Sequence, residues 1–304
     1  MAGTINIEEK TRLLKKRKRV ARMKKTIVMT IALWMIGSLL AIVFLTLKIA
    51  SLQKQITIIL DARVVREKQT ATSTEILDEI PFLTVDNAEN LAQEGDIPMV
   101  YLTFDDGPSA SSNAILDILD DYGVKATFFC IGQEDEASAE VYKRIVDEGH
   151  TIAMHSYSHN YSDIYASEES FQNDFNRIRS LILSRTGVEC EFYRFPGGSS
   201  NRVANTEMSN FANFLNEQGV VYYDWNVSSG DATSSAFTAE QLVDNVMKDV
   251  VKYKTSVVLL HDASNKTATV EALPNLIEAL QAEGAMVLPI TKDTTVIQHM
   301  SVLQ

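Results

Sequence analysis

The stretch Thr103-Phe104-Asp105-Asp106-Gly107-Pro108-Ser109 ends an apolar run that begins at Met99 and has the composition of a β-strand. It places two adjacent carboxylates at the end of that strand. Neighbouring carboxylates repel each other, so a buried pair needs a cation or an arginine nearby. Asp, Gly and Pro also favour turns on their own account. The stretch alone leaves a turn and a charged site as open interpretations, and the surrounding chain decides between them.

Apolar runs typical of strands alternate with amphipathic stretches typical of helices from residue 97 onward. This alternation predicts an α/β fold, a parallel sheet with crossover helices. The predicted strands are Met99–Phe104, Ala126–Ile131, Thr151–His155, Phe192–Phe195, Val220–Trp225, Ser256–His261 and Ala285–Ile290. Glycines placed as helix C-caps end several helical stretches: Gly123, Gly149, Gly187, Gly219 and Gly284. About seven such parallel strands would close, or nearly close, a barrel.

Polar residues follow the predicted strands at the ends where the strands finish. They are Asp105 and Asp106 after the first strand, His155 and His159 after the third, Arg194 in the fourth, Asp224 in the fifth and His261 in the sixth. Parallel α/β barrels build their active sites at the carboxyl ends of their strands. Chance would have scattered these residues over both ends, so their placement predicts an enzyme.

His155 and His159 are four residues apart, which allows one turn of chain to direct both imidazoles at one metal. Either histidine alone is more often a hydrogen-bonded structural residue. Two imidazoles with one carboxylate make a common open zinc site. Zinc proteases with this spacing carry a glutamate between the histidines as their base, whereas Ser156-Tyr157-Ser158 stands here. The base must come from elsewhere, and Asp105 is the obvious candidate.

Charge is unevenly spread along the 304 residues, whose net charge is −12. Residues 1–25 hold ten Lys or Arg against two Glu, a net charge of +8, so the rest of the chain carries −20. Thr26–Leu47 is an uncharged apolar run long enough to span a bilayer as a helix. The basic block before it predicts a cytoplasmic N-terminus and an extracellular acidic portion. The alternative of a cleaved signal peptide is disfavoured by the length of the run and by Lys48.

These features predict four regions: a cytoplasmic basic tail (1–25), a transmembrane helix (26–47), an extracellular stalk (48–95) and a catalytic domain (96–304). A dense basic block can also indicate nucleic acid, but beside an apolar span it is better explained as a topology signal, and we expect no nucleic-acid partner. Cys130 and Cys190 could pair in an extracellular setting. The interpretation as two separate buried thiols is favoured, because Cys130 ends one strand-like run and Cys190 begins another, which would put them at opposite ends of a parallel sheet.

Five stretches resemble, in order, the motifs of the polysaccharide deacetylases, also called NodB-homology or family-4 carbohydrate esterases. They are Thr103–Ser109, His155–His159, Arg194–Gly198, Asp224-Trp225 and Leu259–Asp262, and the resemblance covers roughly residues 97–290. It implies a distorted (β/α) barrel that binds one divalent metal, usually Zn²⁺, and removes acetyl groups from amino sugars in polymers. By the same resemblance, Asp106, His155 and His159 are metal ligands, Asp105 is the general base and His261 is the general acid.

Supporting roles follow from the chemistry that such a hydrolysis needs. The N–H of Gly197 is expected to stabilise the developing oxyanion, and Arg194 to keep Asp105 ionised. Asp224 is expected to hold the tautomer of His261. Three further residues are assigned to substrate binding: Trp225 and Leu259 line a pocket for the acetyl methyl group, and Tyr223 lies under a sugar ring. Trp225 and Leu259 could instead be barrel core, which is the commoner outcome for aromatic and aliphatic strand residues.

Two positions depart from the family pattern. Gly197 stands where an aromatic residue often follows the proline of the third motif, and Val221 stands where the fourth motif often has a further aspartate. With its predicted anchor, the chain most resembles the peptidoglycan N-acetylglucosamine deacetylases of Gram-positive bacteria, with a cell-wall polysaccharide as substrate. The alternatives are a deacetylase of poly-N-acetylglucosamine, chitin oligomers or acetylated xylan, and a wall-binding protein that has lost catalysis.

Overall fold

The computed structural model describes residues 97–301. The predicted basic tail (1–25), membrane helix (26–47) and stalk (48–95) lie outside these residues, so they stay predictions. Among the described helices, none is long and apolar enough to cross a bilayer.

A curled parallel sheet of eight strands forms the centre of the described domain. Its strands are β1 (Met99–Asp105), β2 (Thr127–Ile131), β3 (Thr151–Ser156), β4 (Phe192–Tyr193), β5 (Val221–Tyr222), β6 (Val227–Ser228), β7 (Thr255–His261) and β8 (Met286–Val287). Their order is β5-β4-β3-β2-β1-β7-β6, with β8 paired to the start of β1. The pairings in this part of the chain are all parallel, so the carboxyl ends of the strands share one edge.

Strand β1 is the centre of this sheet. It pairs with β7 along its whole length, from Met99 opposite Thr255 to Asp105 opposite His261. Its seven residues are all buried, which explains why it reads as a continuous apolar run in the sequence. Side chains alternate between the two faces of the strand: Val100, Leu102 and Phe104 join the large core under the helices, and Met99 and Tyr101 join a smaller core made by strands.

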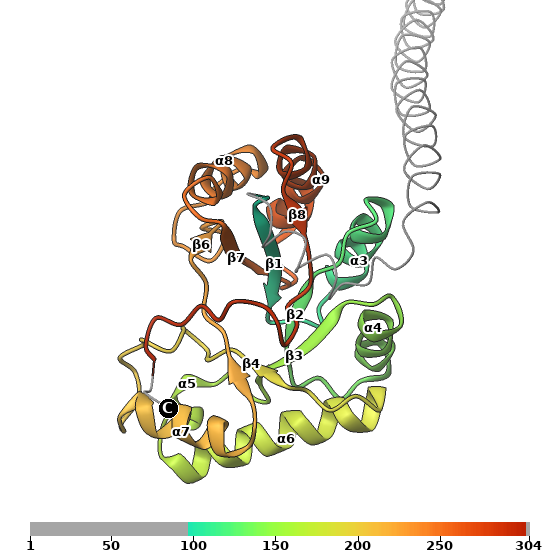
Figure 1. Cartoon of the computed structure of the whole chain (residues 1–304). Helices are drawn as coiled ribbons and strands as arrows, with labels where there is room; N and C mark the ends of the chain where they lie inside the picture. Colours follow the sequence, from blue (N-terminus) through green and yellow to red (C-terminus); the bar gives the residue numbers. More distant parts are fainter. Residues whose placement is uncertain (1–96, 302–304) are drawn as a thin grey trace, which may run out of the picture. The chain divides into compact units, whose positions relative to one another are not determined.

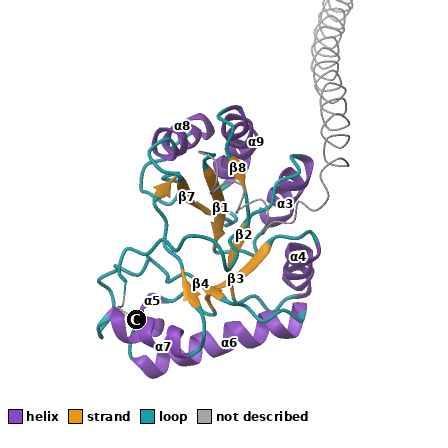
Figure 2. Cartoon of the chain, viewed as in Figure 1, coloured by secondary structure: helices purple, strands orange, loops and turns teal. Residues whose placement is uncertain are grey.

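Helices cover the outside of the strands, as Figures 1 and 2 show. They are α3 (Ser112–Asp121), α4 (Glu136–Asp147), α5 (Tyr161–Ile164), α6 (Glu168–Thr186), α7 (Met208–Glu217), α8 (Ala239–Val250) and α9 (Thr267–Ala282). The longest, α6, begins where the Ser167 side chain accepts a hydrogen bond from the Ser170 N–H. It ends at Gly187, whose φ of 74° is left-handed and suits glycine. The other four predicted C-cap glycines also have positive φ, so that prediction is confirmed.

The seven predicted strands are all present, but the sheet differs from the prediction in two respects. Strands β4, β5 and β8 are only two residues long, and β6 was not predicted. No pairing within residues 97–301 joins β5 to β6, so the barrel is open there. Beyond the end of β5, the N–H of Asp224 donates to the carbonyl of Ile297 in the C-terminal segment, not to a neighbouring strand.

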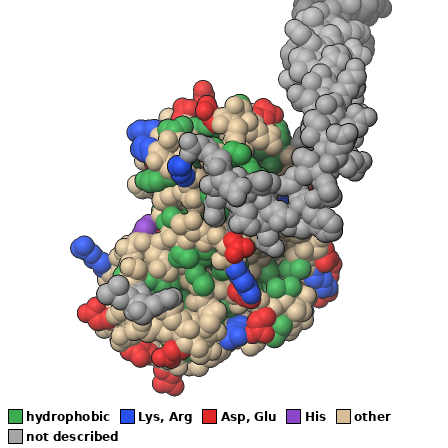
Figure 3. Space-filling view, in the orientation of Figure 1, with side chains coloured by type: hydrophobic (Ala, Val, Ile, Leu, Met, Phe, Trp, Pro, Cys, Tyr) green, Lys and Arg blue, Asp and Glu red, His purple; other side chains and the backbone are tan. Residues whose placement is uncertain are grey.

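That C-terminal segment, residues 291–301, runs from β8 across the domain towards α7 as the dark red trace in Figure 1. Cys130 and Cys190 are both buried and both free, as the favoured interpretation expected. On the face drawn in Figure 3, acidic and basic side chains are interspersed with uncharged and hydrophobic ones.

Candidate active site

Three potential metal ligands converge at the carboxyl edge of the sheet. Asp106 follows β1, His155 lies in β3 and His159 lies in the loop after β3, and their ligand atoms all fall within 4.8 Å of one another. The Oδ1 atom of Asp106 lies 3.6 Å from Nε2 of His155 and 3.1 Å from Nε2 of His159. Asp106 and His159 both have positive φ, 75° and 49°, a conformation that is uncommon outside glycine. Such local backbone strain often marks functional sites.

The polar atoms of this cluster suit a cation. Asp106 Oδ1 is buried and has no hydrogen-bond partner within residues 97–301. His155 Nδ1 lies 2.7 Å from the Arg194 carbonyl oxygen, which can only accept, so Nδ1 carries the proton and Nε2 offers its lone pair. Burial lowers the pKa of His155 to about 3, so its ring is neutral, the form that binds metals. The donor set of two imidazoles and one carboxylate therefore fits one divalent ion.

The second carboxylate of the pair, Asp105, is held by a buried arginine. Arg194 Nη1 donates to Asp105 Oδ1 at 2.8 Å and to Thr103 Oγ1 at 2.7 Å, and its other nitrogens donate to the carbonyls of Tyr223 and Asp224. The guanidinium also stacks on the ring of Phe129, 4.1 Å from its centroid. Burial raises the pKa of Asp105 above the usual carboxyl value, although Arg194 opposes this. The predicted pairing of Arg194 with Asp105 is present.

His261 lies beside Asp105, since the two residues are register partners at the ends of β7 and β1. Its Nδ1 atom lies 2.8 Å from Oδ1 of Asp231. The other carboxylate oxygen of Asp231 accepts from the His261 backbone N–H at 2.8 Å and from the Thr269 hydroxyl at 2.9 Å. Burial lowers the pKa of His261, but the carboxylates of Asp231, Asp105 and Asp106 together outweigh it and the net pKa is raised.

Asp231 therefore orients His261, and the prediction that Asp224 does so is wrong. The Asp224 carboxylate accepts from the Ser199 N–H at 2.8 Å and from the His299 N–H at 2.7 Å, so it ties two loops together. The physical reason is strand order: Asp231 follows β6, which is the neighbour of β7, whereas Asp224 follows β5 at the opposite edge of the sheet. His299 lies in the C-terminal segment and anchors it through this contact.

The chain resembles known proteins in sequence and in fold. A family model described as polysaccharide deacetylase matches residues 92–213. YheN of Bacillus subtilis, provisionally named a polysaccharide deacetylase, is 32% identical over 250 residues, which cover 81% of this chain and 84% of that protein. The chain belongs to the polysaccharide deacetylase family. The protein is therefore an enzyme, a hydrolase of the carbohydrate esterase type.

Further relatives of this deacetylase carry a more specific name. A peptidoglycan-N-acetylglucosamine deacetylase of Bacillus cereus is 30% identical over 190 residues, 61% of this chain and 67% of that protein. The crystal structure of the catalytic domain of a peptidoglycan N-acetylglucosamine deacetylase from Eubacterium rectale superposes with a TM-score of 0.63 at 40% identity, covering 66% of this chain and 92% of that one. These relatives share the domain that contains the candidate site.

The residues predicted to bind substrate in this deacetylase divide into two groups. Tyr223 is 1% exposed and packs in the smaller core, where its hydroxyl donates to the Thr294 carbonyl, so the prediction that it lies under a sugar ring is wrong. Leu259 is buried in β7 but belongs to neither core cluster. Trp225 is partly exposed, and its ring contacts the His299 ring with centroids 4.9 Å apart. Trp225 and Leu259 remain candidates for the acetyl pocket.

Tyr161 is a residue near the site that the sequence reasoning missed. Gly197 is exposed and has φ 78°, and a Cβ atom on it would lie 3.0 Å from the Tyr161 ring. The Tyr161 ring also stands edge-on to the ring of His159, with centroids 5.6 Å apart. An aromatic side chain from the start of α5 therefore lies beside Gly197, where the third motif often carries its own. Its position two residues after His159 was the available signal.

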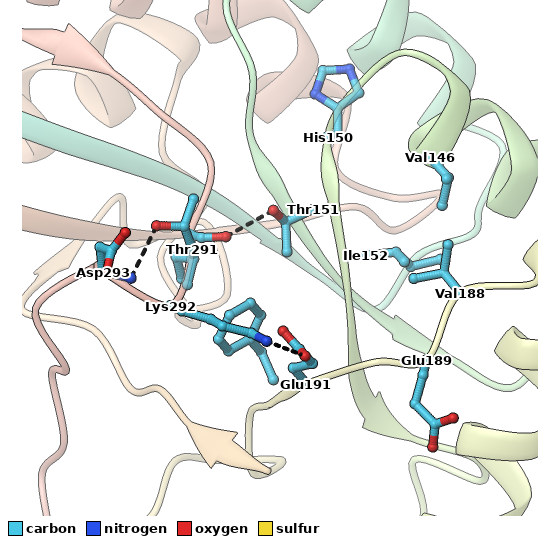
Figure 4. A pocket seen from close by; sticks show the side chains of 12 residues that line it. Val146, His150, Thr151, Ile152, Val188, Glu189, Glu191, Thr291, Lys292 and Asp293 are labelled. Carbon is cyan, nitrogen blue, oxygen red and sulfur yellow. Dashed lines mark hydrogen bonds and ion pairs between the residues drawn. The ribbon is translucent and has the colours of Figure 1, made fainter. Parts of the chain in front are cut away.

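A separate cavity of about 510 Å³ lies away from the carboxyl ends of the strands, beside the starts of β3 and β4 (Figure 4). It is lined by the first residues of β3 and β4, Thr151 and Phe192, and by the chain that follows β8. An ion pair between Lys292 and Glu191 crosses it at 2.7 Å. Since parallel strands place the chemistry of this deacetylase at their carboxyl ends, this cavity is not part of the candidate site.

Proposed function

We propose that this deacetylase removes N-acetyl groups from N-acetylglucosamine units of peptidoglycan by a metal-dependent hydrolysis. The names of the Bacillus cereus and Eubacterium rectale relatives support peptidoglycan as the polymer. The observation that carries the proposal is the placement of three metal-ligand atoms within 4.8 Å of one another, next to Asp105 and His261 on paired strand ends. Metal-dependent hydrolysis of an amide requires a bound cation, a base and an acid, and these residues supply a cation site, a carboxylate base and an imidazole acid.

Asp106, His155 and His159 would hold the ion, and their donor set favours Zn²⁺. When bound, such an ion supplies Lewis acidity: it acidifies water and polarises the amide carbonyl. Burial keeps the ring of His155 neutral, and the Arg194 carbonyl accepts a hydrogen bond from Nδ1–H, which leaves Nε2 free to bind the ion. This orientation by a backbone acceptor is typical of histidines that bind metals.

Asp105 acts as the general base that takes a proton from the attacking water. The side chain of Asp105 is 4% exposed, and the ion pair with Arg194 engages Oδ1 and leaves Oδ2 free of that pair. The raised pKa that burial gives Asp105 makes it a stronger base than an ordinary carboxylate, while Arg194 favours its ionised form. Charge that develops on the carbonyl oxygen is stabilised by the N–H of Gly197. Trp225 and Leu259 enclose the acetyl methyl group.

His261 acts as the general acid that protonates the leaving nitrogen, because an amine departs only when it is protonated. Asp231 accepts the Nδ1–H of His261, so Nε2 presents the proton that is transferred. The raised pKa of His261 keeps this proton in place near neutral pH. The division between a base beside Arg194 and an acid beside Asp231 follows from the partners each residue has.

The test is acetate release from purified peptidoglycan, with the sugar products identified by mass spectrometry. Poly-N-acetylglucosamine, chitin oligomers and acetylated xylan serve as competing substrates. We expect release of acetate from N-acetylglucosamine of peptidoglycan at the highest kcat/KM. Faster release from another of these polymers would change the substrate, and binding to wall without release of acetate from any of them would refute an enzymatic role.

We propose further that the catalytic domain lies outside the cell and is tethered to the membrane by one N-terminal helix. Support comes from the sequence: the apolar run Thr26–Leu47 follows a block of net charge +8. A polymer of the cell wall is accessible only from that side.

A further inference from the structure

The loop Ser156–His159 must place the second imidazole beside the first. It begins at Ser156, the last residue of β3, and turns back so that His159 adopts φ 49°. A left-handed conformation at a non-glycine residue costs free energy, so surrounding contacts must hold it. The backbone N–H groups of the turn also need acceptors, because buried donors without partners are destabilising.

Those acceptors come from one side chain on another element. Asp174, in α6, is 8% exposed, and its carboxylate receives four hydrogen bonds from the loop. Oδ2 accepts from the Tyr157 N–H at 2.7 Å and from the Ser156 hydroxyl at 2.8 Å. Oδ1 accepts from the Ser158 N–H at 2.9 Å and from the Ser158 hydroxyl at 2.7 Å. The loop is thus wrapped around a single carboxylate.

The Ser156 hydroxyl connects Asp174 to the metal-ligand candidate His159. An ionised carboxylate only accepts hydrogen bonds, so the Ser156 hydroxyl must donate to Asp174. The lone pairs of that hydroxyl then face the His159 N–H, which donates to it at 2.9 Å. Asp174 therefore sets the direction of the Ser156 hydroxyl, and the hydroxyl fixes the backbone of His159.

The other side of the loop is fixed by Gly132, the residue that follows β2. The N–H of Gly132 lies 3.1 Å from the Ser156 carbonyl oxygen and 3.0 Å from that of Tyr157. A Cβ atom on Gly132 would lie 2.6 Å from the Tyr157 ring, so the two segments are in close contact. With its carbonyls bound to Gly132 and its N–H groups bound to Asp174, the loop has little freedom to move the imidazole of His159.

We propose that Asp174 is a positioning residue for the metal site: it holds His159 at the distance from Asp106 and His155 that one divalent ion requires. This inference rests on the proposed metal-dependent function. Residues that orient a ligand without touching the metal typically contribute ~10–100-fold to metal affinity. Asp174 positions His159 through the backbone of the loop Ser156–His159, and no sequence motif indicates this role.

The test is the Zn²⁺ dissociation constant of the purified full chain, measured by competition with a chromophoric chelator. Asp174→Asn keeps the shape of the side chain but turns one acceptor into a donor, so the N–H of Tyr157 or of Ser158 faces a donor. We expect its dissociation constant to rise ~10–100-fold. Glu169→Gln is the control, because it removes one exposed carboxylate from the same helix. Its affinity should equal that of the wild type.

A matched pair of serine variants keeps the test decisive if Asp174→Asn does not fold. Ser156→Ala and Ser158→Ala each remove one hydroxyl that donates to Asp174, but only the Ser156 hydroxyl also binds His159. We expect Ser156→Ala to weaken Zn²⁺ binding more than Ser158→Ala. Equal affinities for the wild type and a folded Asp174→Asn, or for the two serine variants, would overturn the role of Asp174. A wild type that binds no Zn²⁺ would instead overturn the proposed metal site.

Discussion

Replacing Asp231 by asparagine is expected to impair the general acid without disturbing the metal ligands. The Asp231 carboxylate is buried, and its Oδ1 lies 2.8 Å from Nδ1 of His261. A hydrogen bond to a charged group is worth ~1.5–3 kcal/mol. This free energy favours the protonated ring over the neutral one, so losing it corresponds to about 10–100-fold in the protonation equilibrium.

The direction in which Asp231→Asn changes the pH dependence of activity follows from the raised pKa of His261. The adjacent carboxylate raises the pKa of His261, and the acid must be protonated to act, so activity falls as the pH rises through this pKa. Asp231→Asn lowers the pKa of His261 and moves the alkaline limb of the pH profile of kcat/KM to lower pH. The loss of activity should therefore be largest at alkaline pH and smallest on the acidic side of the optimum.

The assay is acetate release from peptidoglycan over a range of pH values, with the metal content of each variant measured in parallel. Asp224→Asn is the matched control, because it removes a buried carboxylate that binds Ser199 and His299 instead of His261. Its alkaline limb should stay in place, although its stability should fall. An alkaline limb that moves in Asp224→Asn and stays in Asp231→Asn would refute the assignment.

Three further outcomes are expected. Asp105→Asn should lower kcat by ~10²–10⁴-fold while the metal is retained. Because the variant leaves the buried Arg194 without its countercharge, its free energy of unfolding, measured by thermal unfolding, should also fall by up to ~3–5 kcal/mol. Loss of the metal in this variant would contradict the role of Asp105 as the base. His261→Ala should reduce hydrolysis of N-acetyl substrates far more than hydrolysis of an aryl acetate ester, whose leaving oxygen needs no proton; equal losses would remove His261 as the acid. Protease added to wall-stripped cells should digest the catalytic domain and spare residues 1–25, whereas a protected domain would reverse the predicted topology.

The long central strands could be predicted from sequence because their burial on both faces leaves a continuous apolar run. The predicted strands Met99–Phe104, Thr151–His155 and Ser256–His261 each placed a polar residue, Asp105, His155 or His261, at the carboxyl edge, and the structure brings these three residues together. The order of the strands in the sheet could not be predicted from the sequence. β6 has only two residues, Val227–Ser228, and it is part of the sheet through its pairing with β7. The role of Asp231 depends on that pairing.

Contacts between distant parts of the chain explain the other misses. Tyr223 was expected to face the substrate, but its hydroxyl binds the Thr294 carbonyl 71 residues later, in a segment without regular structure. Asp174 lies 16 to 18 residues from the loop it binds, with no charge pattern to connect them. Periodicity reports which face of an element is buried, and it carries no information on which distant polar group will meet it.

Acetate release from peptidoglycan, measured before and after removal of metal, tests the central claim most directly. The wild type should release acetate, lose this activity when a chelator strips the ion, and recover it when one equivalent of Zn²⁺ per chain is added back. Mass spectrometry should then find glucosamine in place of N-acetylglucosamine in the products. Release of acetate at an unchanged rate from the fully stripped protein, with no ion retained at Asp106, His155 and His159, would contradict the account.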